Sequence, residues 1–338
     1  MTVYTDNSRF AATVLPEEVT DRFVPVEPAS EEIRPFLGRI FPGNRDLFCA
    51  PWEGLPFRLL ITEHASCSQY DQLIELARER SGLPDRVACL AGSGRGFHGF
   101  KGRPWAAWPG NIHLSVFLAP NGPMESFQVA FTGLAALSVT EALDQIPGLS
   151  ARPRIKWVND VLLEEKKVAG ILAYTQSRDT TVTSAVLGFG LNVETTPSVE
   201  PTPFVPEVGS LRDYLPPGAS DARGEVLFAL LRALEKNYRI LLSQGPRQVL
   251  ARYRDRSMVI GQDVTVCPEA SDHTGEVMVQ GRVTGLGENL ELILEGRSTP
   301  VTSGRLIMGL VDEKTEHWEQ AGLEATEPRP APEGCIHA

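Results

Sequence analysis

The sequence predicts an α+β protein with a second, smaller β-domain near its C-terminal end. Between residues 57 and 256, short apolar segments of strand length are interspersed with helical segments. Over residues 262–309 the pattern changes to short strands at regular spacing, which is typical of a small β-barrel. The expected division is an irregular N-terminal arm (1–55), a main domain (56–256), a β-barrel domain (257–311) and a charged tail with a helix fragment (312–338).

Length and composition exclude several classes of protein. The chain has 338 residues, long enough for two domains or for one large domain with a small appendage, and its 42% hydrophobic and 22% charged residues are typical of a globular protein. It contains no run of eighteen apolar residues and no signal-like N-terminus, so we expect neither export nor membrane insertion. Five scattered cysteines without CxxC spacing favour reduced thiols in a cytoplasm. A net charge of −11 disfavours nonspecific attraction to nucleic acid or anionic lipid.

The first part of the chain is predicted to form an N-terminal arm, then a strand, a helix and a second strand. Prolines interrupt residues 1–55 too often for a DNA-recognition helix, so we expect an arm that packs on the main domain. Residues 57–62 read as a buried strand and 68–80 as an amphipathic helix. Ser66 and Ser68 stand where an N-cap would be. Residues 87–91 read as the next buried strand.

The most glycine-rich and basic stretch of the chain follows, GSGRGFHGFKGRPWAAWPGN at 92–111. Its GxGxxG pattern formally matches the dinucleotide fingerprint, but no helix-forming run and no acidic residue about 20 positions on follow it. A Walker loop is excluded because no GK[ST] is present. Glycines let backbone amides approach an anion, cations neutralise phosphate or carboxylate, and an indole offers a flat face to a base. Composition equally fits a surface loop with aromatic anchors.

The organising stretch is RIKWVNDVLLEEKKVAG, at 154–170. It comes after a strand at 111–119, in which His113 is interpreted as a half-buried structural histidine, and a helix at 125–146. It predicts two short strands around a bend at Asn159 and Asp160, an exposed acidic turn, and Lys167 on re-entry. Because its apolar residues belong inside, Lys156, Asn159, Asp160 and Lys167 face either solvent or a ligand.

Two further strands follow at 168–175 and 181–193, and the second ends in GFGLNV. The glycines of that motif allow another backbone or a ligand to come close, and Asn192 offers a two-sided amide of the kind that reads a nucleobase edge. Alone, an asparagine there is more often a turn former. A proline-rich connection (195–217) and helices at 224–242 and 246–255 complete the main domain.

Four motifs in this order, GRGFHGFKGRPW, KWVNDVLL, KKVAGIL and GFGLNV, resemble those of the biotin protein ligases, within the biotin/lipoate ligase superfamily. The resemblance covers about residues 57–310. It implies a mixed sheet flanked by helices, of the class II synthetase-like kind, with a C-terminal SH3-like barrel. It also implies two steps: a carboxylate attacks the α-phosphate of ATP, and a lysine of a carrier-protein domain then attacks the acyl-adenylate.

The resemblance also implies roles for individual residues. Lys167 would bridge carboxylate and phosphate and stabilise the transition state. Asp160 would hold Mg²⁺, with Asn159 to assist it. Trp105 would stack on adenine and Asn192 would bond to it. The remaining adenylate or ATP contacts would be Lys101, Gly102, Arg103 and Gly170, and the biotin contacts Ser66, Cys67, Ser68, Gly94, Arg95 and Gly96.

The chain departs from the family pattern mainly where the acyl group is recognised. The family loop is usually GRGRxGR, and an arginine expected over the adenylate is here Phe97 or Phe100, depending on the alignment. No glutamine occurs in RVACLAGSG, the Ser-Thr-Asn trio is Ser66-Cys67-Ser68, and the proline of KWPND is Val158. The alternatives are therefore a ligase for lipoate, octanoate or another small carboxylic acid, or a non-catalytic adenylate-binding relative. An open sheet edge could pair with the carrier domain or with a twin subunit in a homodimer.

Overall fold

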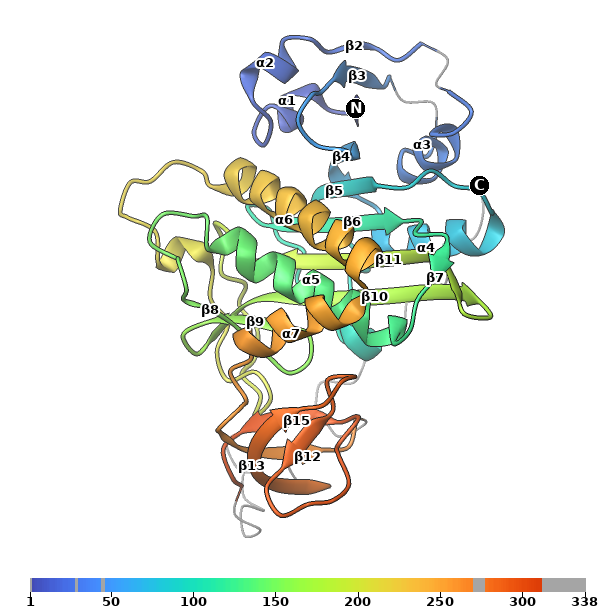
Figure 1. Ribbon diagram of the computed structural model, residues 1–338. Coiled ribbons are helices and arrows are strands. Elements are labelled where there is room, and N and C mark those ends of the chain that lie inside the picture. The colour runs from blue at the N-terminus through green and yellow to red at the C-terminus, as the bar shows by residue number, and fades with distance from the viewer. Residues whose placement is uncertain (1, 28–29, 44–45, 270–276, 312–338) are drawn as a thin grey trace, which may run out of the picture.

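The computed structural model describes residues 2–27, 30–43, 46–269 and 277–311 (Figure 1). Within them, a large mixed sheet has the strand order β2-β3-β1-β4-β5-β6-β11-β10-β9-β8, and β7 pairs with β11. Its strands are β1 (Thr2–Thr5), β2 (Val24–Pro25), β3 (Phe48–Pro51), β4 (Arg58–Ala65), β5 (Val87–Gly94), β6 (Ile112–Leu118), β7 (Gly122–Pro123), β8 (Pro153–Lys156), β9 (Asp160–Leu163), β10 (Lys166–Arg178) and β11 (Thr181–Leu191). Strands β1, β4 and β5 are parallel neighbours, and the other pairs are antiparallel.

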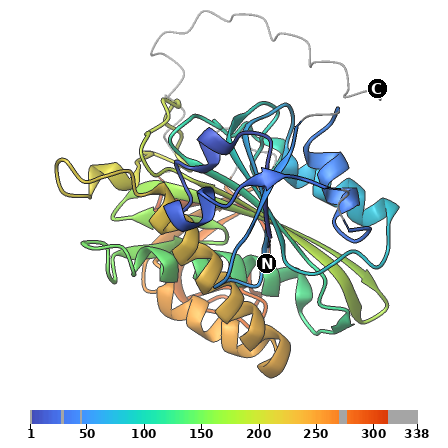
Figure 2. The same cartoon turned by 90° about the horizontal axis from the view of Figure 1, so that it is seen from above.

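Helices cover both faces of this sheet. They are α1 (Ser8–Ala11), α2 (Glu17–Thr20), α3 (Arg34–Ile40), α4 (Gln69–Glu79), α5 (Phe127–Leu143), α6 (Arg223–Gln244) and α7 (Pro246–Arg256), with 3₁₀ turns η1 (Phe100–Gly102) and η2 (Leu211–Asp213). Figure 2 shows α5, α6 and α7 on one side and α3 and α4 on the other. Side chains alternate accordingly: Leu59 and Ile61 join the core under α5, whereas Leu60 joins the core under α3 and α4. The predicted α+β class with a mixed, helix-flanked sheet is confirmed.

The expected irregular arm at 1–55 is wrong for much of its length. Strand β1 pairs in parallel with β4 and antiparallel with β3, so this segment extends the main sheet. Val3 and Ala50 are fully buried, because their side chains belong to the hydrophobic core on one face of the sheet. The prolines of this segment stand at strand ends and do not prevent the strands from forming, since edge strands tolerate proline. Four residues are too few for alternation to stand out in the sequence.

A small antiparallel sheet follows α7, with the strand order β14-β13-β12-β15. Its strands are β12 (Asp263–Cys267), β13 (Val279–Leu286), β14 (Leu292–Leu294) and β15 (Arg305–Met308). It docks on the end of the main sheet: Trp157 Nε1 donates to the carbonyl oxygen of Leu290 at 2.7 Å, and the Arg254 guanidinium donates to the carbonyls of Leu286 and Gly287. The expected boundary near 257 stays a prediction, and the expected tail at 312–338 lies outside the described residues.

No described helix is both long and apolar enough to span a bilayer.

Candidate functional site

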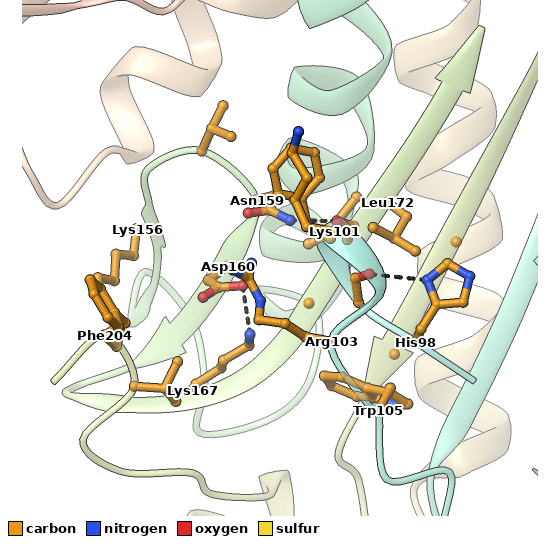
Figure 3. A pocket seen from close by; sticks show the side chains of 18 of the residues that line it. His98, Lys101, Arg103, Trp105, Lys156, Asn159, Asp160, Lys167, Leu172 and Phe204 are labelled. Carbon is orange, nitrogen blue, oxygen red and sulfur yellow. Dashed lines mark hydrogen bonds and ion pairs between the residues drawn. The ribbon is translucent and has the colours of Figure 1, made fainter. Parts of the chain in front are cut away.

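A cavity of about 620 Å³ lies where the main sheet, the glycine-rich loop and the small sheet meet. Strands β10 and β11 and the turn between β8 and β9 form its floor (Figure 3). The loop around residues 97–106 forms one wall, and the connection at 197–208 with β15 forms another. Segments far apart in the chain therefore converge on one space.

The turn from β8 to β9 brings a carboxylate to a lysine. Ile155, Val161 and Leu163 are fully buried and anchor the two strands in the core. Strand β9 then pairs with β10, and Lys167 Nζ reaches Asp160 Oδ1 at 2.7 Å. The two side chains are 20% and 19% exposed, so both are accessible from the cavity. This pair is the charged centre of the site.

The backbone around the pair is held from both sides. The Lys167 amide donates to the Glu207 carbonyl at 3.0 Å, and the Gly209 amide donates to the Lys167 carbonyl at 3.0 Å. Asn159 Nδ2 donates to the Ile171 carbonyl at 2.7 Å, and the Ile171 amide donates to the Asn159 carbonyl at 2.9 Å. Asn159 therefore braces the turn against β10, whatever its part in binding.

Two glycines allow Trp105 to lie directly on the sheet. A Cβ atom at Gly190 would come within 2.3 Å of the Trp105 indole, and one at Gly170 within 3.2 Å. The Trp105 Nε1 donates to His113 Nδ1 at 3.3 Å, and His113 Nε2 lies 3.1 Å from the Trp108 carbonyl oxygen. Burial lowers the pKa of His113 to about 4, although the Trp108 carbonyl opposes the shift. The histidine is therefore neutral near pH 7, and it is almost fully buried rather than half-buried.

Asn192 supplies an acceptor at the same end of the sheet. Its side chain is fully buried and lines the cavity, and its Nδ2 donates to the Gly209 carbonyl at 2.9 Å. Its Oδ1 has no hydrogen-bond partner among the described residues. An unpaired buried acceptor costs about 1–3 kcal/mol, so a ligand that donates to it gains that energy back. An exocyclic amine of a base is such a donor.

The glycine-rich loop folds over the cavity and is tied to α4. The Trp105 amide donates to the Phe97 carbonyl at 3.0 Å, which closes the loop on itself. His98 Nε2 lies 2.9 Å from the Asp71 carboxylate, and His98 Nδ1 lies 3.0 Å from the Gly99 carbonyl oxygen. Burial opposes protonation of His98, but the Gly99 carbonyl and Asp71 outweigh it and raise its pKa. The contact between His98 and Asp71 thus ties the loop to the helix.

The structure brings together most of the predicted site residues. Those that line the cavity are Ser68, Lys101, Arg103, Trp105, Asn159, Asp160, Lys167, Gly170 and Asn192. Those outside its lining are Ser66, Cys67, Gly94, Arg95, Gly96 and Gly102. Gly94 is covered by the ring of Phe97, since a Cβ at Gly94 would meet that ring at 2.3 Å. Ser68 caps α4, and its Oγ accepts from the Asp71 amide at 3.3 Å.

The lining residues that were not assigned a role from the sequence include Lys156, Phe204 and Arg305. Lys156 was recognised only as facing solvent or a ligand. Phe204 and Arg305 lie in the connection and in the small sheet, which no motif linked to the site. Their contribution depends on how the small sheet docks, and local sequence patterns carry no signal for that contact.

Comparison with known proteins identifies related sequences. A model of the biotin/lipoate A/B protein ligase family matches residues 74–192. The chain is 34% identical over 244 residues to a biotin–[acetyl-CoA-carboxylase] ligase of Mycobacterium tuberculosis, an alignment that covers 69% of this chain and 83% of that protein. For the ligase of the same name from Paracoccus denitrificans, identity is 31% over 213 residues, with 61% and 81% covered.

Further similarities are to a bifunctional protein and to a solved structure. The chain is 26% identical to the bifunctional ligase/repressor BirA of Bacillus subtilis; the alignment covers 65% of this chain and 64% of BirA, so the chain spans less than two thirds of that relative. The structure of a biotin protein ligase from Aquifex aeolicus in complex with biotin and ATP superimposes with a TM-score of 0.56 at 21% identity, over 74% of this chain and 97% of that one. This structural likeness supports the fold.

Proposed function

This chain belongs to the biotin/lipoate A/B protein ligase family, and from that premise we propose that it is an ATP-dependent biotin–protein ligase. The carboxylate of biotin would attack the α-phosphorus of ATP, and the bond to pyrophosphate would break. A lysine amine of a carrier-protein domain would then attack the acyl-adenylate and release AMP. The observation that carries the proposal is the Lys167–Asp160 pair, which shares one cavity with Trp105 and Asn192.

The first step brings two anions together, so it needs a fixed cation between them. Lys167 is suited to this role because its ammonium lies 2.7 Å from Asp160 and still faces the cavity. Its charge would offset the negative charge that develops as carboxylate and phosphate approach. The centroid of the Trp105 ring lies 5.9 Å from Lys167 Nζ, and the ring offers a flat face to adenine. Asn192 Oδ1 would accept a hydrogen bond from the exocyclic amine of adenine.

Asp160 would also contribute to a Mg²⁺ site. The described residues contain no cluster of three or more carboxylate, imidazole or thiolate groups that could hold a resident ion. One carboxylate beside a nucleotide cavity suits Mg²⁺ instead, because this ion commonly uses one or two carboxylates, phosphate oxygens and water. Such an ion would neutralise charge on the triphosphate when bound.

A second candidate is a ligase for lipoate or octanoate. Phe97, His113 and Leu172 line the cavity, and Phe97 stands in the loop where relatives are expected to carry glycine or arginine. The rings of Phe97 and His113 meet edge to face, with centroids 5.6 Å apart. Such an aromatic wall suits a long apolar acyl chain as well as a fused ring.

The test is incubation with ATP, Mg²⁺ and each of a panel of acids, followed by detection of the acyl-adenylate by mass spectrometry. Biotin should yield an adenylate and transfer to a biotin carrier domain. If octanoate or lipoate yields one and biotin does not, the biotin assignment is wrong and the second candidate holds. If no acid yields an adenylate while ATP still binds, the chain is a non-catalytic adenylate-binding relative.

We propose that the protein acts in a reducing compartment, the cytoplasm, because its five cysteines are scattered without CxxC spacing and Cys49, Cys89 and Cys267 are free thiols. Its partner is the acceptor carrier domain. At one end of the main sheet, the edge strand β2 could pair with that domain or with a second copy of the chain; at the other end, Ile155 of β8 already bridges to Ser257. Size-exclusion chromatography with and without the carrier domain distinguishes the two.

A further inference from the structure

The glycine-rich loop is attached to the rest of the protein at few points, although it forms a wall of the cavity. Its lining residues are Phe97, His98, Gly99, Phe100, Lys101 and Arg103. Inside the loop, the Gly99 amide donates to the Arg103 carbonyl at 2.6 Å, and the Gly102 amide donates to the Gly99 carbonyl at 3.2 Å. Of residues 96–104, only His98 hydrogen-bonds to a part of the described chain outside residues 96–105. His98 is therefore the polar attachment of this wall.

Both ring nitrogens of His98 face groups that accept hydrogen bonds. Nε2 lies 2.9 Å from each oxygen of the Asp71 carboxylate, and Nδ1 lies 3.0 Å from the Gly99 carbonyl oxygen. A backbone carbonyl and an ionised carboxylate have no proton to donate, and a neutral imidazole carries only one N–H. Either neutral tautomer would leave one of the two contacts without a hydrogen. Both contacts are hydrogen bonds only when the ring is an imidazolium.

The surroundings of this contact also favour the charged ring. Asp71 lies in the first turn of α4, where the helix N-terminus stabilises a carboxylate, and it pairs with His98. The Tyr70 ring meets the His98 ring edge to face, with centroids 6.2 Å apart. Burial works against the charge, but the Gly99 carbonyl and Asp71 raise the pKa of His98 above its ordinary value of 6.5. Geometry and electrostatics therefore point to the same protonation state.

His98 stands at the end of the cavity that suits the acyl group. Figure 3 shows His98 and Leu172 on the side of the cavity opposite Lys156. The preceding residue, Phe97, contributes the aromatic wall described above. Because the two residues are adjacent in the chain, a movement of His98 away from Asp71 displaces the Phe97 ring as well. The attachment of the loop and the shape of the apolar wall are thus coupled.

We propose that His98 is a positioning residue of the ligase reaction: paired with Asp71, its imidazolium holds the glycine-rich loop against α4 and keeps Phe97 on the acyl group. When the ring loses its proton, one of its two contacts loses its hydrogen, and the loop is held less tightly. The affinity for the acid should therefore be greatest at low pH and decrease as the pH rises through the pKa of His98. The nature of the ligand rests on the proposed function, whereas the attachment of the loop does not.

The test compares two variants of His98 between about pH 5.5 and about pH 8, a range in which a carboxylic acid stays ionised. His98→Arg keeps a cation beside Asp71 throughout, and His98→Gln keeps a neutral side chain. Calorimetry measures the affinity for biotin and for octanoate. The unmodified chain should match His98→Arg at the low end and His98→Gln at the high end. The two levels should differ about threefold to fivefold, as for a partly exposed ion pair, and both variants should give flat profiles.

The other titratable groups near His98 are on α4 and on its own loop. Asp71 and Tyr70 face it from the helix, and Lys101 and Arg103 belong to the loop. Tyr70 stays protonated in this range because burial raises its pKa. His98 is the one among them whose ordinary pKa lies inside the range, so the profile reports on this ring.

Matched controls are Glu75→Gln and His64→Gln. Glu75 is an exposed carboxylate of α4 that pairs with Arg39, and His64 is an exposed histidine near the end of β4. Both controls should keep the pH profile of the unmodified chain. A pH profile that persists in His98→Gln would overturn the positioning role. Equal losses of affinity in both His98 variants at every pH would assign His98 a merely structural role and overturn it too.

Hydrogen exchange of the loop amides tests the attachment without any ligand. At about pH 7, the hydrogen-bonded amides of Gly99, Gly102 and Trp105 should be less protected in His98→Gln than in His98→Arg, by about threefold to fivefold. Equal protection in the two variants contradicts the proposal. If no acid yields an adenylate, the proposed function is refuted, and the exchange of these amides still decides whether His98 holds the loop.

Discussion

Lys167 and Asp160 form an ion pair that the local sequence around either residue does not dictate. Each is about one fifth exposed, so the pair is partly desolvated and its attraction is stronger than that of a surface ion pair. The lysine is oriented by the carboxylate and by backbone hydrogen bonds to the connection at 205–209. A charge held in this way needs no reorganisation when the reaction begins.

Lys167→Ala should therefore lower the rate of acyl-adenylate formation by about 10²- to 10³-fold, the cost of removing one charge stabiliser. The rate is measured as pyrophosphate release with ATP and biotin. Lys166→Ala, one residue earlier on β10, is the control and should keep the rate. Retained activity in Lys167→Ala, with a folded protein by thermal melting, would remove this lysine from the mechanism.

Gly190 lies directly under the Trp105 indole. We predict that Gly190→Ala displaces the Trp105 indole, because the new methyl group would lie 2.3 Å from the ring. The hydrogen bond from Trp105 to His113 would be lost with it. ATP affinity should fall about tenfold if one aromatic stacking contact is lost, and tryptophan fluorescence should change. Gly38→Ala is the control, since a Cβ there meets nothing within 4 Å.

At the scale of elements, the strands at the N-terminal end of the chain are part of the main sheet. Strand β1 continues the parallel arrangement of β4 and β5, and Val3 lies opposite Leu59 in the core. Helix α1 lies beside them, and its Phe10 covers Gly92, at the end of β5 that leads into the glycine-rich loop. The segment therefore supports the base of that loop.

The corresponding prediction concerns stability. Val3→Asp should lower the free energy of unfolding by several kcal/mol, because it places an unpaired charge in the core. Val24→Asp is the matched control, since Val24 is 54% exposed on the edge strand β2. Urea denaturation of both variants measures the difference. Equal stabilities would mean that this segment is only loosely attached.

At the scale of the whole molecule, the cavity is built between two sheets. The floor comes from β10 and β11, and part of one wall comes from β15. The contacts of Trp157 with Leu290 and of Arg254 with Leu286 hold the sheets together. The cavity is therefore a product of both sheets and not of the main sheet alone.

The net charge leads to a prediction about nucleic acid. With a charge of −11 and described residues 2–51 folded as strands and short helices of the main sheet, we expect no DNA binding at physiological salt. Fluorescence anisotropy with labelled duplexes measures this. Sequence-dependent binding tighter than about 10⁻⁶ M would contradict the prediction, because nonspecific contacts alone do not reach that affinity.

Local sequence determined the regular elements well. The helix expected at 68–80 is α4 (Gln69–Glu79), and the strand expected at 111–119 is β6 (Ile112–Leu118). The bend at Asn159 and Asp160 and the return of Lys167 were also legible, since polar residues interrupted an apolar pattern. Periodicity and turn chemistry act over a few residues, and the sequence displays them directly.

Only the tertiary structure decided how these parts combine. It placed Trp105 on Gly190, brought Arg305 beside Lys156, and turned an expected arm into strands of the sheet. It also left Gly94 to Gly96 outside the cavity lining, and the Phe97 ring covers Gly94. Such contacts join residues that are distant in the chain, and their energies depend on docking and burial. Those quantities arise only when the whole chain packs, so no local pattern records them.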